Sequence, residues 1–230
     1  MIKAVAFDLD NTLIDFSNFK KLTSINAARA MIDYGLNEDF ARLYSKIWQT
    51  YDIKGIEYQK TFSDVLIEYK LDLNEFERIQ QAAITAYLKT KFEVLRPYSD
   101  VLWVLLKIRS NGMKTGIITD APRNKAWQRL VITGLDVAFD YVITFDDTKK
   151  TKPDAKPFEL FLEKSNLNAH EVLFIGDNPE RDVLGARKAG MITGLAKYGW
   201  QLNKDSLQKA DYELDDIIDL FNVIEELNKK

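Results

Sequence analysis

The feature that most constrains the fold is a pair of carboxylates, Asp8 and Asp10, at the end of the first apolar run. The run itself, residues 2–7, is short and rich in strand-forming residues, so it predicts a buried strand. In open α/β sheets, ligands bind just beyond the carboxyl ends of the strands. Two buried like charges repel each other unless a cation or a shared proton offsets them. The pair therefore predicts a metal site at this strand end, and its oxygen ligands favour a hard cation.

Length and composition narrow the class of protein. The chain has 230 residues, of which 46% are hydrophobic and 29% charged, which is typical of a folded domain, alone or with an insertion. A formal net charge of -3 argues against a nucleic-acid partner, because nucleic-acid binders are normally basic. The absence of cysteine excludes disulfide and thiol chemistry and fits the cytoplasm. No apolar run is long enough for a membrane span or has the pattern of a signal peptide, so we expect no membrane partner. Nothing in the sequence specifies an oligomeric state.

Two patterns divide the chain. From residue 16 to residue 95, apolar side chains recur at helical spacing, and we expect four helices, near 19–35, 38–51, 57–69 and 74–89. After Pro97, helices alternate with strands, which we expect near 114–119, 141–144, 172–175 and 191–196, with a short edge strand at 211–213.

Strands separated by single helices imply a parallel, doubly wound sheet. We therefore predict an α/β protein with a Rossmann-like core. That core comprises residues 1–15 and 96–230, and an all-α cap domain of residues 16–95 is inserted after the first strand.

Polar side chains fall at the ends of four expected strands. They are Asp8 with Asp10, then Thr119, then Lys152 beyond the third strand, and finally Asp177. The carboxyl ends of parallel strands lie along one edge of a sheet, so these residues can converge although they are far apart in the chain. Each signal is weak when taken alone, and their order along the chain makes the combination specific.

These residues make the chain resemble the haloacid dehalogenase-like hydrolase superfamily. The resemblance spans nearly the whole core and is closest to the subgroup that carries a helical cap between its first and second motifs. The matching segments are Asp8-Leu9-Asp10-Asn11-Thr12, Ile117-Ile118-Thr119-Asp120, Lys152-Pro153 and Gly176-Asp177-Asn178-Pro179-Glu180-Arg181-Asp182.

The resemblance implies roles for the acidic residues that their chemistry supports. Asp8 is expected to be the nucleophile that forms an aspartyl-phosphate, and also a ligand of Mg²⁺. Asp10 is expected to protonate the leaving oxygen, then to activate water, and to give its backbone carbonyl to the metal. Asp177 is expected to bind Mg²⁺ directly, and Asp182 directly or through water. Thr12 is expected to bond within the loop and to hold Asp10.

The remaining site residues are expected to handle the phosphate. Thr119 would donate a hydrogen bond to a phosphate oxygen. Asp120, which follows it, is also expected among the phosphate-binding residues, although a neutral residue there would repel the phosphate less. Lys152 would neutralise the charge that develops on the transferring group. Asn178 would orient the loop that carries the metal ligands.

Asp10 also separates the two reactions that the resemblance covers. A halide leaves without a proton, whereas an alkoxide needs a general acid, so a carboxylate at this position favours phosphoryl transfer. We predict a Mg²⁺-dependent phosphatase that acts on a small phosphorylated metabolite, because a cap over the site would obstruct larger substrates. Two alternatives stay open at this point: a phosphomutase of the same superfamily, and a non-catalytic phosphate-binding module.

Overall fold

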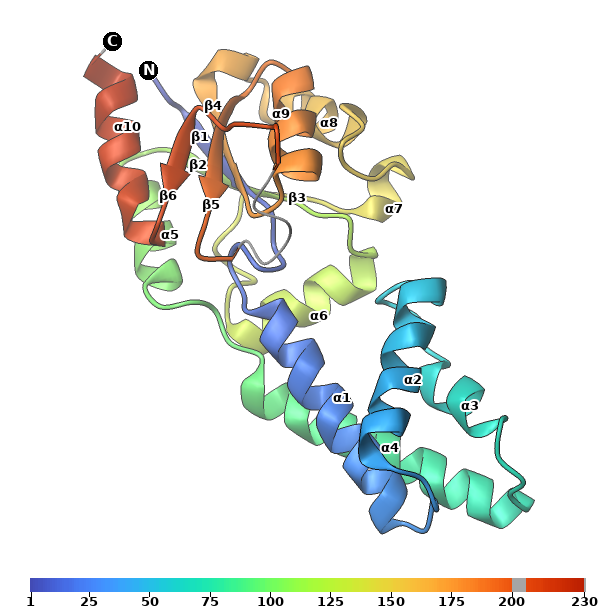
Figure 1. The fold of residues 1–230 in the computed structure, drawn as a ribbon. Coiled ribbons are helices and arrows are strands. Elements are labelled where there is room, and N and C mark those ends of the chain that lie inside the picture. Colours follow the sequence, from blue (N-terminus) through green and yellow to red (C-terminus); the bar gives the residue numbers. More distant parts are fainter. Residues whose placement is uncertain (200–205, 230) are drawn as a thin grey trace. The chain divides into compact units, whose positions relative to one another are not determined.

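The structure is a computed structural model that describes residues 1–199 and 206–229. Within these residues six parallel strands form one sheet, in the order β3-β2-β1-β4-β5-β6 (Figure 1). This confirms the predicted α/β class and the parallel, doubly wound sheet. The strands are β1 (Ala4–Phe7), β2 (Lys114–Ile118), β3 (Tyr141–Ile143), β4 (Val172–Gly176), β5 (Ile192–Ala196) and β6 (Tyr212–Leu214).

Helices cover both faces of the sheet. Every residue of β1 and β4 is buried, because these central strands have helices on either side. Figure 1 shows α5 and α10 along one face, with α8 and α9 along the other. The helices of this unit are α5 (Val101–Ser110), α6 (Arg123–Thr133), α7 (Phe145–Thr148), α8 (Lys156–Ser165), α9 (Leu184–Lys188) and α10 (Leu220–Lys229), with short turns η1 (Ala169–Glu171), η2 (Pro179–Val183) and η3 (Ile217–Asp219).

Contacts divide the chain into two compact units. One unit comprises Met1–Asp15 and the residues from Arg96 onward, and the other comprises Phe16–Leu95. The second unit is entirely helical, and its buried core includes Met31, Leu43 and Ile47. Its helices are α1 (Phe16–Asp33), α2 (Phe40–Lys54), α3 (Thr61–Leu66) and α4 (Leu73–Val94).

Two of these helices differ in length from their predicted ranges. α3 is shorter than expected. The Thr61 hydroxyl donates a hydrogen bond to the Tyr58 carbonyl, and the residues before Thr61 form a turn instead of the first part of the helix. α4 is longer, and it begins at a capping box in which Asp72 and Glu75 exchange hydrogen bonds between side chain and backbone. Such caps satisfy N–H groups that the helix itself leaves unpaired.

Strand register sets where the polar residues lie. Phe7 pairs with Ile117 on one side and with Ile175 on the other, so β1, β2 and β4 end at the same level. The Asp8 N–H extends the ladder by donating to the Ile175 carbonyl at 2.8 Å. Residues that follow these strands therefore share one edge of the sheet. Over the part of the chain that the structure describes, no helix is both long and apolar enough to cross a membrane.

Candidate active site

The loop after β1 folds into a tight turn that fixes Asp8 at the strand end. Asn11 adopts a left-handed conformation with φ of 60°, and its N–H donates to the Ile14 carbonyl at 2.8 Å. The N–H of Leu13 turns back to the Leu9 carbonyl at 3.0 Å. Asparagine tolerates the left-handed region better than most residues, which suits this turn. The backbone of residues 8–14 is thus closed on itself.

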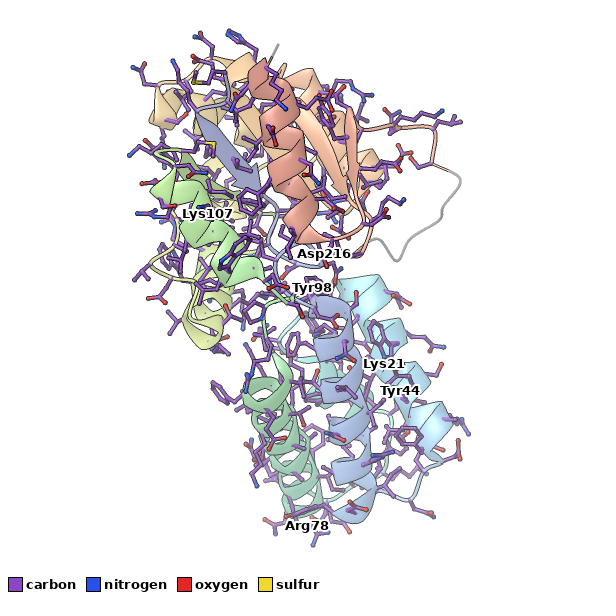
Figure 2. All side chains as sticks on the ribbon, turned by 90° about the vertical axis from the view of Figure 1, so that its left-hand side faces the viewer. Lys21, Tyr44, Arg78, Tyr98, Lys107 and Asp216 are labelled. Atoms are coloured by element: carbon purple, nitrogen blue, oxygen red, sulfur yellow. The ribbon has the colours of Figure 1, made fainter. Side chains whose placement is uncertain are left out.

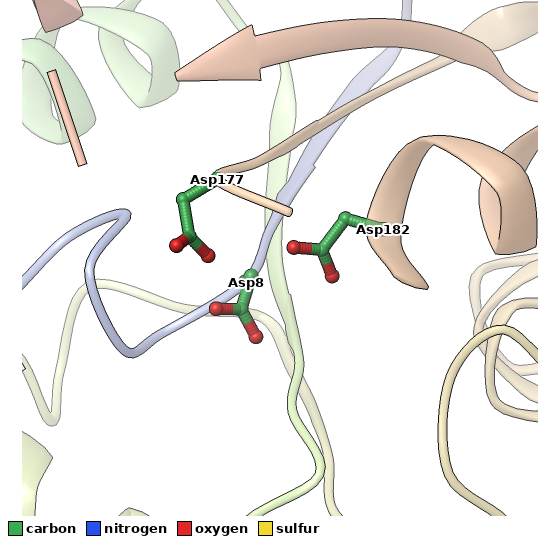
Figure 3. A group of neighbouring side chains, drawn as sticks. All are labelled: Asp8, Asp177 and Asp182. Atoms are coloured by element: carbon green, nitrogen blue, oxygen red, sulfur yellow. The ribbon is translucent and has the colours of Figure 1, made fainter. Parts of the chain in front are cut away.

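Three buried carboxylates converge beside this loop. Asp8, Asp177 and Asp182 are 7%, 8% and 2% exposed. One oxygen from each lies within 4.8 Å of the others, and Figure 3 shows the carboxylates directed toward a common point. Gly176 permits this approach, since a Cβ atom there would lie 2.4 Å from the Cβ of Asp182. The sheet edge therefore brings together acids that are some 170 residues apart in the chain.

Lys152 provides the positive charge next to this cluster. Its ammonium lies 2.5 Å from Oδ1 of Asp8 and 2.6 Å from Oδ1 of Asp182, and it also donates to the Ile118 carbonyl at 3.1 Å. Burial works against the charged form of Lys152, but the carboxylates of Asp182 and Asp8 outweigh it and raise its pKa above the usual range. The lysine therefore stays charged across the physiological range.

The charge balance of the cluster fits a divalent cation. Three carboxylates and one ammonium leave two negative charges uncompensated in a buried site, which is the charge that one divalent ion would supply. Burial raises the pKa of Asp177 to about 9, and the carboxylates of Asp182 and Asp8 add to that rise. Burial likewise raises the pKa of Asp8 to about 7, although Lys152 pulls it down. Carboxylate oxygens in this arrangement suit Mg²⁺ and similar hard ions.

The loop after β4 distinguishes Asp177 from Asp182. Oδ2 of Asp182 accepts the N–H of Asn178 at 3.0 Å, while its Oδ1 contacts Lys152. Both oxygens of Asp182 therefore already have protein partners. The side chain of Asn178 accepts the N–H groups of Glu180 and Arg181, so η2 begins directly after it, at Pro179. The segment between β4 and β5 is thus a wide turn, η2, followed by the short α9.

Thr119 and Asp120 follow β2 at the same edge. The Thr119 N–H donates to the Ile143 carbonyl at 2.9 Å, and its hydroxyl accepts the N–H of Ala121 at 3.2 Å. Its hydroxyl hydrogen remains available as a donor. Asp120 forms an ion pair with Arg181 and accepts the backbone N–H of Lys152 at 2.9 Å. The Asp120 carboxylate therefore ties the loops that follow β2, β3 and β4 to one another.

Asp10 pairs with an arginine that the sequence reasoning did not identify. Nη1 of Arg129 lies 2.6 Å from Oδ2 of Asp10, and the arginine is 3% exposed. Arg129 belongs to α6, where it lies on the buried face with Ala126 and Leu130. A charged residue on the apolar face of an expected helix was the available signal, since buried charges are normally paired.

Two residues that follow β5, Tyr198 and Gly199, contact the loop after β1. The Tyr198 hydroxyl donates to the Thr12 carbonyl at 2.9 Å, and its ring packs edge-on against Tyr98, labelled in Figure 2. A Cβ atom at Gly199 would lie 1.6 Å from the Asn11 carbonyl oxygen, so only glycine fits there. The Thr12 hydroxyl is buried and has no hydrogen-bond partner among the described residues, so the expected side-chain bond is replaced by this backbone contact.

Comparison with known proteins gives matches over most of the chain. A profile of the haloacid dehalogenase-like hydrolase family matches residues 2–190. The sequence is 32% identical over 230 residues to glyceraldehyde 3-phosphate phosphatase of Methanocaldococcus jannaschii, covering 100% of both chains. It is 36% identical over 230 residues to the protein of that name from Pyrococcus abyssi, covering 99% of this chain and 96% of the relative. The crystal structure of a HAD phosphatase from Thermococcus onnurineus superposes with a TM-score of 0.72 at 26% identity, covering 97% and 98% of the two chains.

Proposed function

Because the chain belongs to the haloacid dehalogenase-like hydrolase family and is a phosphoric monoester hydrolase of that family, we propose that it hydrolyses a small phosphorylated metabolite with Mg²⁺ through an aspartyl-phosphate intermediate. The observation that carries the proposal is the buried cluster of Asp8, Asp177 and Asp182 around the ammonium of Lys152. It combines a nucleophile, a cation site and a fixed positive charge at one strand end.

The acids of the cluster would bind Mg²⁺ in two ways, either directly or through water. Asp8 and Asp177 would hold the ion directly together with the backbone carbonyl of Asp10, and Asp182 would act through water because both of its oxygens have protein partners. A bound Mg²⁺ would offset the charge of carboxylate and phosphate together. Metal-bound or paired carboxylates stay ionised despite burial, which keeps Asp8 nucleophilic at neutral pH.

The side chains of the core would carry out the two chemical steps. Asp8 attacks phosphorus, and Asp10 gives a proton to the leaving oxygen. Asp10, now ionised, takes a proton from the water that attacks the aspartyl-phosphate, which releases phosphate and restores Asp8. Thr119 would donate its hydroxyl hydrogen to a phosphate oxygen, and Lys152 would stabilise the charge on the transferring group. Asp120 would act indirectly, because its carboxylate accepts the backbone N–H of Lys152 and so holds that residue in place.

The relatives suggest the first substrate to test. Two proteins that are 32% and 36% identical over nearly the whole chain carry the name glyceraldehyde 3-phosphate phosphatase. We therefore infer that glyceraldehyde 3-phosphate, or a three-carbon phosphate like it, is hydrolysed by this chain. A panel of phosphorylated metabolites that includes this compound and pyrophosphate would rank the substrates by kcat/KM.

Phosphate release from p-nitrophenyl phosphate tests the reaction itself. We expect turnover with Mg²⁺, none after removal of the metal by a chelator, and none in the Asp8→Asn variant. Asp52→Asn is the matched control, because Asp52 is exposed on α2 and its loss should leave kcat unchanged. Full turnover by Asp8→Asn would eliminate Asp8 as the nucleophile.

The same assay separates the alternatives. A phosphomutase would return the phosphoryl group to an organic acceptor, so free phosphate would not accumulate in step with substrate loss. A non-catalytic module would bind phosphate without releasing product. We expect one phosphate for each substrate consumed.

A further inference from the structure

Arg129 is a buried charge outside the motifs that define the family. Its side chain comes from α6 and is almost completely removed from solvent. Burying a guanidinium is costly unless a carboxylate and hydrogen bonds compensate it. Its contact with Oδ2 of Asp10, at 2.6 Å, supplies such a carboxylate.

The contact acts on the side chain of Asp10, whereas the loop holds its backbone. The backbone of Asp10 is held by its bridge to Ile14 and by the turn at Asn11. These bonds leave the rotation of the side chain undetermined. A short, charge-assisted hydrogen bond from a rigid helix restricts that rotation, since arginine presents its donors in a planar fork.

We propose that Arg129 is a positioning residue that holds the carboxyl group of Asp10 in the orientation required for proton transfer. The inference rests on the proposed function, in which Asp10 acts as general acid and base. Because the guanidinium engages Oδ2, proton transfer falls to Oδ1. In the first step the proton moves from Oδ1 to the leaving oxygen as the bond between phosphorus and that oxygen breaks. In the second step Oδ1 takes a proton from the attacking water.

This role predicts a dependence on the leaving group. An alkyl phosphate expels a poor leaving group that needs a proton, whereas p-nitrophenolate leaves readily without one. A misplaced general acid should therefore lower kcat/KM, which reports the step that expels the leaving group, far more for the alkyl ester than for the aryl ester. An arginine that served the fold alone would affect both substrates to the same extent.

The test compares Arg129→Met and Arg129→Lys with wild type on glyceraldehyde 3-phosphate and p-nitrophenyl phosphate. In Arg129→Met, we expect kcat/KM for the alkyl ester to fall about 100-fold and that for the aryl ester by less than about 5-fold. Arg129→Lys keeps the charge but not the fork, so it should show the same pattern with a smaller loss. If the methionine variant does not fold, Arg129→Lys still provides the comparison of kcat/KM between the two substrates.

Two controls make the result specific. Arg109→Met removes another arginine from an ion pair of the same unit, with Asp140, and should change both substrates equally. Combining Arg129→Met with Asp10→Asn should cost no more than Asp10→Asn alone, since the arginine acts through Asp10. Equal losses on both substrates, or additive losses in the double variant, would overturn the inference. A wild-type protein that hydrolyses neither ester would instead refute the proposed function.

Discussion

At the residue scale, the site is defined by its unequal carboxylates. The Asn178 N–H holds one oxygen of Asp182, whereas burial raises the pKa of Asp177 to about 9. Lys152 contacts Asp8 and Asp182, which leaves Asp177 dependent on other positive charge. The structure thus identifies Asp177 as the acid most in need of a cation.

Substitution of Asp177 should therefore act on metal binding first. In Asp177→Asn we expect the Mg²⁺ concentration for half-maximal activity to rise at least about tenfold, because one anionic ligand is lost. A titration of activity with Mg²⁺ measures the change, with Asp52→Asn as the control. An unchanged Mg²⁺ requirement would remove Asp177 from the ligand set.

Some of these residues were predictable and others were not. Asp8, Thr119, Lys152 and Asp177 could be chosen because each follows an expected strand, where residues of parallel strands meet. For Arg129 the only signal was a charge on an apolar helix face, and its role could not be predicted because its partner lies 119 residues away in the chain. The contacts of Asp120 likewise depend on the path of two other loops.

At the element scale, the ends of β1, β2 and β4 determine the geometry of the site. The expected strands agree closely with the observed ones, because short β-branched and apolar runs between turn residues are distinctive. The segment after β4 was harder to predict. Its turn is determined by the side chain of Asn178, which caps two N–H groups, rather than by helical periodicity.

Overpacking at the end of β4 should disturb chemistry as well as stability. In Gly176→Ala the new methyl group would lie 2.4 Å from the Cβ of Asp182, so Asp182 and its contact with Lys152 must shift. We expect unfolding free energy to fall by about 1–3 kcal/mol and kcat to fall at least about tenfold. Denaturant unfolding and steady-state kinetics measure the two effects.

The matched control is Gly116→Ala on β2. Its methyl group would lie 2.1 Å from the Phe161 ring, inside the core and away from the acids. It should lower stability to a similar extent and leave the kcat of the folded fraction near that of wild type. Equal effects of the two substitutions on kcat would show that Gly176 has no special relation to the site.

At the scale of the whole molecule, we expect the buried acids to couple metal binding to stability. The pKa of Asp8 is raised from 3.8 to about 7 and that of Asp177 from 3.8 to about 9, chiefly by burial. Between pH 3.8 and about pH 9, the folded protein without metal therefore binds more protons than the unfolded chain does. Its unfolding free energy should therefore fall as pH rises through this window.

Mg²⁺ should reverse that trend, because it would bind the ionised carboxylates and so stabilise the fold more at higher pH. Thermal melting in chelator and in Mg²⁺, at about pH 5, 7 and 9, measures both effects. The Asp177→Asn variant should show a weaker pH dependence in chelator and a smaller shift with Mg²⁺. If the increase in Tm caused by Mg²⁺ became larger toward acid pH, the ionised carboxylates would not be the groups that bind the metal.

The Asp10→Asn variant shows whether Asp8 forms a covalent phosphoryl intermediate. With p-nitrophenyl phosphate the first step needs little acid help, whereas breakdown of the intermediate needs the base that this variant lacks. Rapid mixing should then give a burst of about one p-nitrophenolate per active site, followed by slow turnover. Mass spectrometry of the quenched protein should place a phosphoryl group on Asp8. Slow release without a burst, from a protein that carries no phosphoryl group, would contradict the account.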